Sequence, residues 1–201
     1  MNPLYFLVWI TSRMIFSLFY DIKISGVENL PDSGCILASN HASFFDPPAI
    51  GSSLPNPIYY LARKSLWNNP IIKWGFDRLN CIPVDQEKPD MTGLKRMIQV
   101  VRDGNAVIMF PEGTRTHDGQ LRPAQPGIGM VVAKTGAPVV PIRIYGTFEA
   151  FPRTGKLRLF VPMRLMIGKP LTFPPVKSSR ENYQMISEKI MEAITALKPE
   201  S

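Results

Sequence analysis

Cysteine and histidine are scarce in this chain, which has two of each among its 201 residues. Cys35 and Cys81 form neither a CxxC pair nor a disulfide framework, so we expect two buried, reduced thiols and a reducing compartment. A metal centre would need more ligands than His41, Asp46 and the distant His117 supply. The sequence therefore predicts neither a bound metal nor a cofactor.

Acidic residues are outnumbered by basic ones, 16 to 23, which gives a formal net charge of +7. A basic balance of this size favours an anionic partner, such as nucleic acid, an anionic lipid surface or a phosphorylated substrate. The basic residues form no block and no helical stripe with interleaved aromatics, so nucleic acid is not expected. Internal repeats, low-complexity tracts and linkers are also lacking, and the length suits one domain.

Residues 1–20 are set apart by their apolar character, and residues 21–201 form the expected domain. The segment 3–20 carries one charge, Arg13, and six aromatic residues. It lacks the basic start and the small-residue cleavage site of a secretory signal. A central Arg costs a membrane-spanning helix about 2.5–3.5 kcal/mol. We expect a helix lying in the membrane interface, with Arg13 reaching the headgroups. The alternative is a buried helix of a soluble protein.

Short apolar runs alternate with helical patterns in the rest of the chain, which predicts an α/β fold: a single domain with a mostly parallel mixed sheet flanked by helices. Strands are expected at residues 21–26, 34–39, 58–62, 106–110, 139–145, 157–160 and 164–167. Helices are expected from Pro47, at 70–79, from Met91 to the stop at Gly104, at 128–135, and at the end of the chain, where Tyr183, Ile186, Ile190, Ile194 and Leu197 recur at helical spacing.

Two polar clusters, residues 40–46 and 111–115, each follow directly on an apolar run expected to be a buried strand. Ligands of open α/β sheets bind outside the carboxyl ends of the strands. Both clusters are therefore predicted to face one crevice.

The first cluster, Asn-His-Ala-Ser-Phe-Phe-Asp, holds a candidate general base. In a loop that enters a helix, Asp46 can fold back onto the imidazole of His41. A carboxylate on one ring nitrogen fixes the tautomer and leaves the other nitrogen to take a proton from an alcohol. The alternative is a structural histidine beside a helix-capping aspartate.

The second cluster lies in the segment Phe-Pro-Glu-Gly-Thr-Arg-Thr, residues 110–116. Gly113 lets the backbone approach an anion closely, and the guanidinium of Arg115 matches a phosphate bidentately. Glu112 is expected to orient Arg115 or to accept a hydrogen bond from a substrate hydroxyl. The alternative is a surface turn closed by a Glu–Arg ion pair.

Together the clusters resemble the glycerophospholipid acyltransferase family, and its 1-acylglycerol-3-phosphate (lysophosphatidic acid) acyltransferases in particular. Residues 40–47 are similar to the family's catalytic block and residues 110–116 to its acceptor-phosphate block. Residues 62–66 resemble its basic segment, residues 78–86 a block that usually ends in Asp-Arg, and residues 140–147 its late Val-Pro block. The resemblance covers roughly residues 26–170.

The resemblance implies transfer of a fatty acyl group from acyl-CoA or acyl carrier protein to the free sn-2 hydroxyl of 1-acylglycerol-3-phosphate, giving phosphatidic acid in phospholipid biosynthesis. It implies a membrane-associated enzyme at the cytoplasmic face. His41 and Asp46 would be catalytic. The residues implied to bind substrate are Lys64, Arg78, Glu112, Gly113, Thr114 and Arg115.

One position departs from the family pattern, because Gln86 stands where a phosphate-binding Arg is usual. Either Lys64, Arg78 or Lys88 supplies that charge, or the acceptor is another lysophospholipid or glycerol-3-phosphate.

Two other classes of function stay open. A covalent hydrolase could use Ser43 or a cysteine, but no G-x-S-x-G elbow surrounds Ser43. A non-catalytic lipid-binding protein of the same fold is the other alternative.

Overall fold

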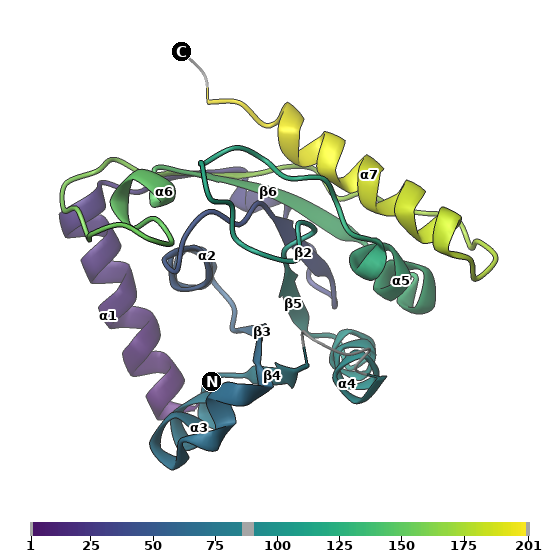
Figure 1. Ribbon diagram of the computed structural model, residues 1–201, viewed down its shortest axis with the longest axis horizontal. Coiled ribbons are helices and arrows are strands. Elements are labelled where there is room, and N and C mark those ends of the chain that lie inside the picture. Colours follow the sequence, from purple (N-terminus) through teal and green to yellow (C-terminus); the bar gives the residue numbers. More distant parts are fainter. Residues whose placement is uncertain (1, 86–90, 200–201) are drawn as a thin grey trace.

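The computed structural model describes residues 2–85 and 91–199 and shows a twisted sheet with helices on both faces (Figure 1). The strands are β1 (Lys23–Ser25), β2 (Ile36–Ser39), β3 (Ile58–Arg63), β4 (Cys81–Val84), β5 (Ala106–Met109), β6 (Val139–Tyr145) and β7 (Arg164–Ile167). The α-helices are α1 (Pro3–Tyr20), α2 (Asp46–Ser53), α3 (Pro70–Arg78), α4 (Met91–Arg102), α5 (Pro126–Thr135), α6 (Thr147–Ala150) and α7 (Arg180–Ala196). Two 3-10 helices, η1 (Val27–Asn29) and η2 (Lys64–Asn68), lie in connections.

The strands are arranged in the order β1-β7-β6-β2-β5-β3-β4. All neighbours are parallel except β6 and β7, which pair antiparallel. The predicted α/β fold with a mostly parallel mixed sheet is therefore confirmed.

Alternate residues of each central strand serve two separate cores. In β2, Ile36 and Ala38 pack into the core beneath α4, α5 and α7, whereas Leu37 packs into the core beneath α1 and α2. This alternation follows from the period of two in a strand, and it explains why the central strands are continuous apolar runs.

The sheet divides between β3 and β5. Their pairing covers two residues on each side, Ile58 with Ala106 and Tyr59 with Val107, and β3 then continues to Arg63 alongside β4. Beyond this point the carboxyl ends of the two strands border a cavity that lies between them.

The strand predicted at residues 157–160 is wrong. These residues are exposed and carry no strand assignment, because β7 already lies between β1 and β6 and offers no free edge. Strand β4 was not predicted, since Pro83 argues against a central strand; β4 lies at the end of the strand order, where a proline is tolerated. The short helix α6 was also missed, because four residues carry no readable period.

Helix α1 lies on the surface of the domain. It begins at the N-cap Asn2, is long and apolar enough to cross a membrane by length and composition, and has 17% of its residues buried. The buried residues are Tyr5, Phe16 and Tyr20, on one narrow stripe. The helix is therefore not buried within the domain. Arg13 is exposed, and its guanidinium donates to the carbonyl oxygen of Ser52 at 3.4 Å.

Candidate active site

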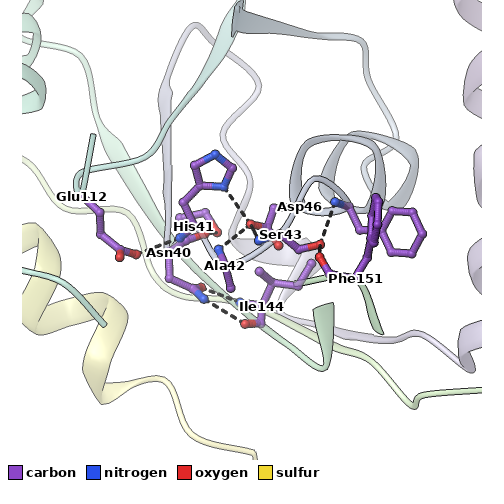
Figure 2. A network of polar contacts seen from close by, with 10 residues as sticks. Asn40, His41, Ala42, Ser43, Asp46, Glu112, Ile144 and Phe151 are labelled. Carbon is purple, nitrogen blue, oxygen red and sulfur yellow. Dashed lines mark hydrogen bonds and ion pairs between the residues drawn. The ribbon is translucent and has the colours of Figure 1, made fainter. Parts of the chain in front are cut away.

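Asn40 sets the direction of the chain where β2 ends. Its side-chain amide donates to the carbonyl oxygen of Ile144 at 3.0 Å, and its Oδ1 accepts from the Ile144 N–H at 2.9 Å (Figure 2). The buried side chain thus imitates the backbone of the next residue in a strand. It continues the contact with β6 while the main chain leaves the sheet and carries His41 into a loop.

His41 and Asp46 form a hydrogen-bonded pair, as predicted. The Nδ1 atom of His41 lies 2.8 Å from Oδ2 of Asp46, and the same oxygen accepts from the backbone N–H groups of Ala42 at 2.6 Å and Ser43 at 2.7 Å (Figure 2). Asp46 is fully buried at the start of α2, where the helix dipole favours a carboxylate. Its position is therefore fixed by backbone donors rather than by the imidazole alone.

The imidazole of His41 is held in place and still reaches the cavity. Its ring stacks on Phe110 with centroids 3.9 Å apart and an interplanar angle of 14°, and its side chain is 18% exposed. Since Asp46 occupies Nδ1, Nε2 is the ring nitrogen left to meet a substrate.

Glu112 joins the two predicted clusters. Its Oε1 accepts from the backbone N–H of His41 at 2.8 Å, and its Oε2 accepts from the backbone N–H of Arg122 at 3.1 Å. Burial raises the pKa of this carboxyl to about 7, against the effect of the two backbone hydrogen bonds. Both oxygens are thus used inside the protein. Glu112 positions the His41 loop, and the alternative of a turn closed by a Glu112–Arg115 ion pair does not hold.

This placement of Glu112 has a measurable consequence for stability. Because the folded-state pKa lies above that of an unfolded glutamate, the stabilisation linked to its protonation is complete below about pH 4.3 and is lost as the pH rises through about 7. We expect the unfolding free energy of Glu112→Gln to fall less between pH 4.5 and 7.5 than that of the wild type. Urea unfolding at several pH values measures the difference, and parallel curves for the two proteins would contradict it.

Arg115 presents an unpaired donor near His41. Its guanidinium carbon lies 3.4 Å from the ring centroid of Phe44, and its buried Nη1 has no hydrogen-bond partner among the described residues. Burial lowers the pKa of Arg115, and the nearby cations Arg153 and Arg63 act in the same direction. A partly buried guanidinium among like charges is what an anionic group would stabilise.

Gly113 and Thr114 also border the cavity. Gly113 has a φ of 72°, which glycine adopts without strain, and its N–H donates to the carbonyl oxygen of Phe110 at 3.0 Å to close a turn. The glycine therefore shapes the loop, and its own N–H is used in that turn.

The cavity has a volume of about 770 Å³ and opens at the carboxyl ends of the strands. Its polar end includes His41 and Arg115, while much of its wall is apolar and runs between the halves of the divided sheet, as at Leu61 and Met109. A long apolar chain with a polar head matches this distribution.

Two cations of the cavity wall, Arg63 and Arg153, were not among the predicted site residues, although Arg63 lies in the segment 62–66 that resembles the family's basic segment. Arg63 is the last residue of strand β3, and the two predicted clusters likewise follow the ends of β2 and β5. Its position at a strand end could therefore have indicated that Arg63 faces the same crevice. Two predicted residues lie elsewhere. Lys64 is exposed and absent from the described cavity wall, and Arg78, also absent from it, stacks on Trp74 at 4.4 Å. Gln86 and Lys88 lie outside the described residues.

Comparison with known proteins adds to this geometry. A protein-family model described as Acyltransferase matches residues 21–145, more than half of the chain. The chain belongs to the acyltransferase family.

Curated relatives of this acyltransferase chain carry consistent names. A 1-acyl-sn-glycerol-3-phosphate acyltransferase of Bacillus subtilis is 35% identical over 163 residues, which cover 79% of this chain and 78% of that protein. The chloroplastic 1-acyl-sn-glycerol-3-phosphate acyltransferase BAT2 of Brassica napus is 36% identical over 159 residues, 76% of this chain and 46% of that protein. The chain thus spans about half the length of such chloroplastic relatives.

A solved structure shares the fold. The crystal structure of the 1-acyl-sn-glycerophosphate (LPA) acyltransferase PlsC of Thermotoga maritima matches with a TM-score of 0.73 and 27% identity, covering 98% of this chain and 81% of that chain.

The three nucleophiles considered for a covalent hydrolase, Ser43, Cys35 and Cys81, lie in environments that do not activate them. Ser43 is fully buried, and its Oγ donates to the carbonyl oxygen of Phe151 at 2.6 Å and accepts from the Phe45 N–H at 3.0 Å. Burial raises the pKa of the Cys35 thiol to about 11 and that of Cys81 to about 12, so both stay protonated at neutral pH. These environments argue against the covalent hydrolase.

Proposed function

We propose that the chain transfers a fatty acyl group from a thioester carrier, acyl-CoA or acyl carrier protein, to the free sn-2 hydroxyl of 1-acylglycerol-3-phosphate, giving phosphatidic acid. The observation that carries the proposal is the His41–Asp46 pair at the mouth of an apolar cavity that also contains the unpaired donor of Arg115. The names of the relatives support this choice of acceptor.

In the proposed reaction, Nε2 of His41 takes the proton of the acceptor hydroxyl as that oxygen attacks the thioester carbonyl. The carbon–sulfur bond then breaks, and the departing thiolate receives the proton from the imidazolium. Asp46 stabilises the charged imidazole and fixes the tautomer that makes Nε2 the acceptor. No acyl-enzyme is required, in keeping with the buried Ser43 and the protonated thiols.

The acceptor phosphate is assigned to the arginines at the polar end of the cavity. Arg115 offers a buried, unpaired Nη1, and Arg63 and Arg153 add two further cations to the wall. A phosphate placed here would satisfy Arg115 and relieve the repulsion among the three guanidinium groups. In the proposed site, Arg63 and Arg153 have the phosphate-binding role that was expected of Lys64 and Arg78.

We further propose that the enzyme works on a membrane surface, on its cytoplasmic side, with α1 in the lipid interface. Support comes from the apolar, mostly exposed surface of α1 and from two cysteines that are both free. Val8 and Trp9 of α1 line the cavity, so acyl chains could pass from the lipid phase into the site.

An acceptor panel tests the proposed function. The chain is supplied with a labelled acyl thioester and, in separate reactions, 1-acylglycerol-3-phosphate, glycerol-3-phosphate, lysophosphatidylcholine or no acceptor. We expect labelled phosphatidic acid with the first acceptor and little product with the others. Thiol release without acceptor would indicate a hydrolase, and no product with any acceptor would indicate a lipid-binding protein. Running the panel with each carrier identifies the donor.

A further inference from the structure

Beyond α1, two other segments expose large apolar side chains. Ile71 and Trp74 of α3 are 79% and 53% exposed, and Leu159 and Phe160 in the loop after α6 are 50% and 72% exposed. Leu7 and Leu18 of α1 are exposed to a similar degree, 56% and 69%. We call these six residues the apolar face.

The three segments of the apolar face are joined. At one end of α1, the Asn2 side-chain amide donates to the carbonyl oxygen of Arg78, the last residue of α3, at 2.6 Å. At the other end, the Phe160 N–H donates to the carbonyl oxygen of Phe19 at 2.9 Å, and the two rings have centroids 6.0 Å apart. Figure 1 shows α3 beside the start of α1 and the loop after α6 beside its end. The three segments that carry the exposed side chains are therefore neighbours along α1.

Phe160 is held outward by an unfavourable backbone conformation. Its φ is 61°, in the left-handed region that bulky residues rarely adopt, and yet its ring is 72% exposed. The strained backbone places the Phe160 ring in water and not in a core. Such strain indicates that the ring contacts another molecule.

The charges around the apolar face indicate what kind of partner it contacts. Residues 156–160 contain two cations, Lys156 and Arg158, and no acidic residue. The one charged residue of α1, Arg13, is exposed and also donates to the carbonyl oxygen of Ser52 at 3.4 Å, so this helix carries one cation and no acidic residue. Exposed apolar side chains interleaved with cations suit the interface of a bilayer that contains anionic lipids.

We propose that α3 and the loop at residues 157–160 enter an anionic bilayer together with α1, so that the domain is held at three points. Phe76 and Leu79, at the end of α3, line the cavity, as do Val8 and Trp9 of α1. Attachment through both elements therefore turns the cavity between them toward the lipid. The inference extends the α1 contact and depends on neither the reaction nor the acceptor.

Vesicle flotation without substrate tests the inference. The full chain is compared with two double variants, Ile71→Ser/Trp74→Ser and Leu159→Ser/Phe160→Ser, on phosphatidylcholine vesicles with and without phosphatidylglycerol. The control is Met185→Ser, a residue of α7 that is 41% exposed and lies away from the apolar face. We expect each double variant to bind the anionic vesicles at least about tenfold more weakly, because each removes two large apolar contacts, and the control to bind like the wild type.

Two results would overturn the inference. One is wild-type binding by both double variants, which would leave α1 as the sole attachment. The other is a concentration-dependent dimer that the same substitutions abolish while vesicle binding stays unchanged, because the apolar face would then join two copies of the chain.

Phe160→Gly separates this role from a structural one. Glycine accepts the positive φ, so the variant should melt at a higher temperature than the wild type while binding anionic vesicles more weakly. A lower melting temperature with unchanged vesicle binding would show that the ring serves the fold instead.

Discussion

Replacing His41 by alanine is expected to lower the turnover number for acyl transfer by about 10²–10⁴, the usual contribution of a positioned general base. The hydroxyl of the acceptor would then have no group to take its proton. Stability should change little, because Asp46 keeps its two backbone donors, Ala42 and Ser43, and the His41 side chain is only part of the packing around Phe110. Initial rates with saturating thioester and acceptor measure the loss, and thermal melting checks the fold.

The chain contains its own matched control for that substitution. His117, the other histidine, is exposed and contacts Arg153 through Nε2 at 3.3 Å, outside the described cavity wall. His117→Ala should keep a turnover number close to that of the wild type. If His41→Ala retained most of its activity, or if the two variants lost activity equally, His41 would not be the base.

The second large effect is expected from Arg115→Ala, which should raise the Michaelis constant for 1-acylglycerol-3-phosphate by roughly ten- to a hundredfold. A hydrogen bond to a charged group contributes about 1.5–3 kcal/mol, and each 1.4 kcal/mol is a factor of ten in affinity. The Michaelis constant for the acyl thioester should move much less. Arg115→Lys should recover only part of the loss, because an ammonium cannot reproduce the planar guanidinium.

Arg102→Ala is a suitable control for the arginine, since it also removes one cation but lies on α4, where its side chain donates to the carbonyl oxygen of Lys134. It should leave both Michaelis constants unchanged. A rise confined to the thioester constant in Arg115→Ala would place the carrier, rather than the acceptor, at this end of the cavity.

The catalytic pair was predictable because its geometry is local. Asp46 lies five positions after His41 at the start of a helix, and the backbone N–H groups between them fold toward one carboxylate oxygen. The meeting of the two clusters was also predictable, because each follows a strand of a mostly parallel sheet. In the structure those strands, β2 and β5, are parallel neighbours.

Other features depended on contacts that a linear sequence does not display. The contacts of Glu112 were not predicted, because both partners are backbone N–H groups. One of them belongs to His41, which lies far from Glu112 in the chain. Arg153 follows a helix too short to be recognised, and it lies close enough to Arg115 to lower its pKa although the two residues are far apart in the chain. The loop at residues 157–160 imitates a strand in its alternation, and only the occupied edges of β7 show otherwise.

The central claim is that one acceptor molecule meets both the base and the arginine, and a comparison of two acceptors tests it most directly. The ratio of kcat/KM for 1-acylglycerol-3-phosphate to that for 1-acylglycerol, which lacks the phosphate, is measured in the wild type, Arg115→Ala and His41→Ala. The proposed site predicts a large ratio in the wild type, a ratio reduced by about tenfold or more in Arg115→Ala, and an unchanged ratio with a uniform loss of rate in His41→Ala. A ratio that Arg115→Ala leaves intact would contradict it.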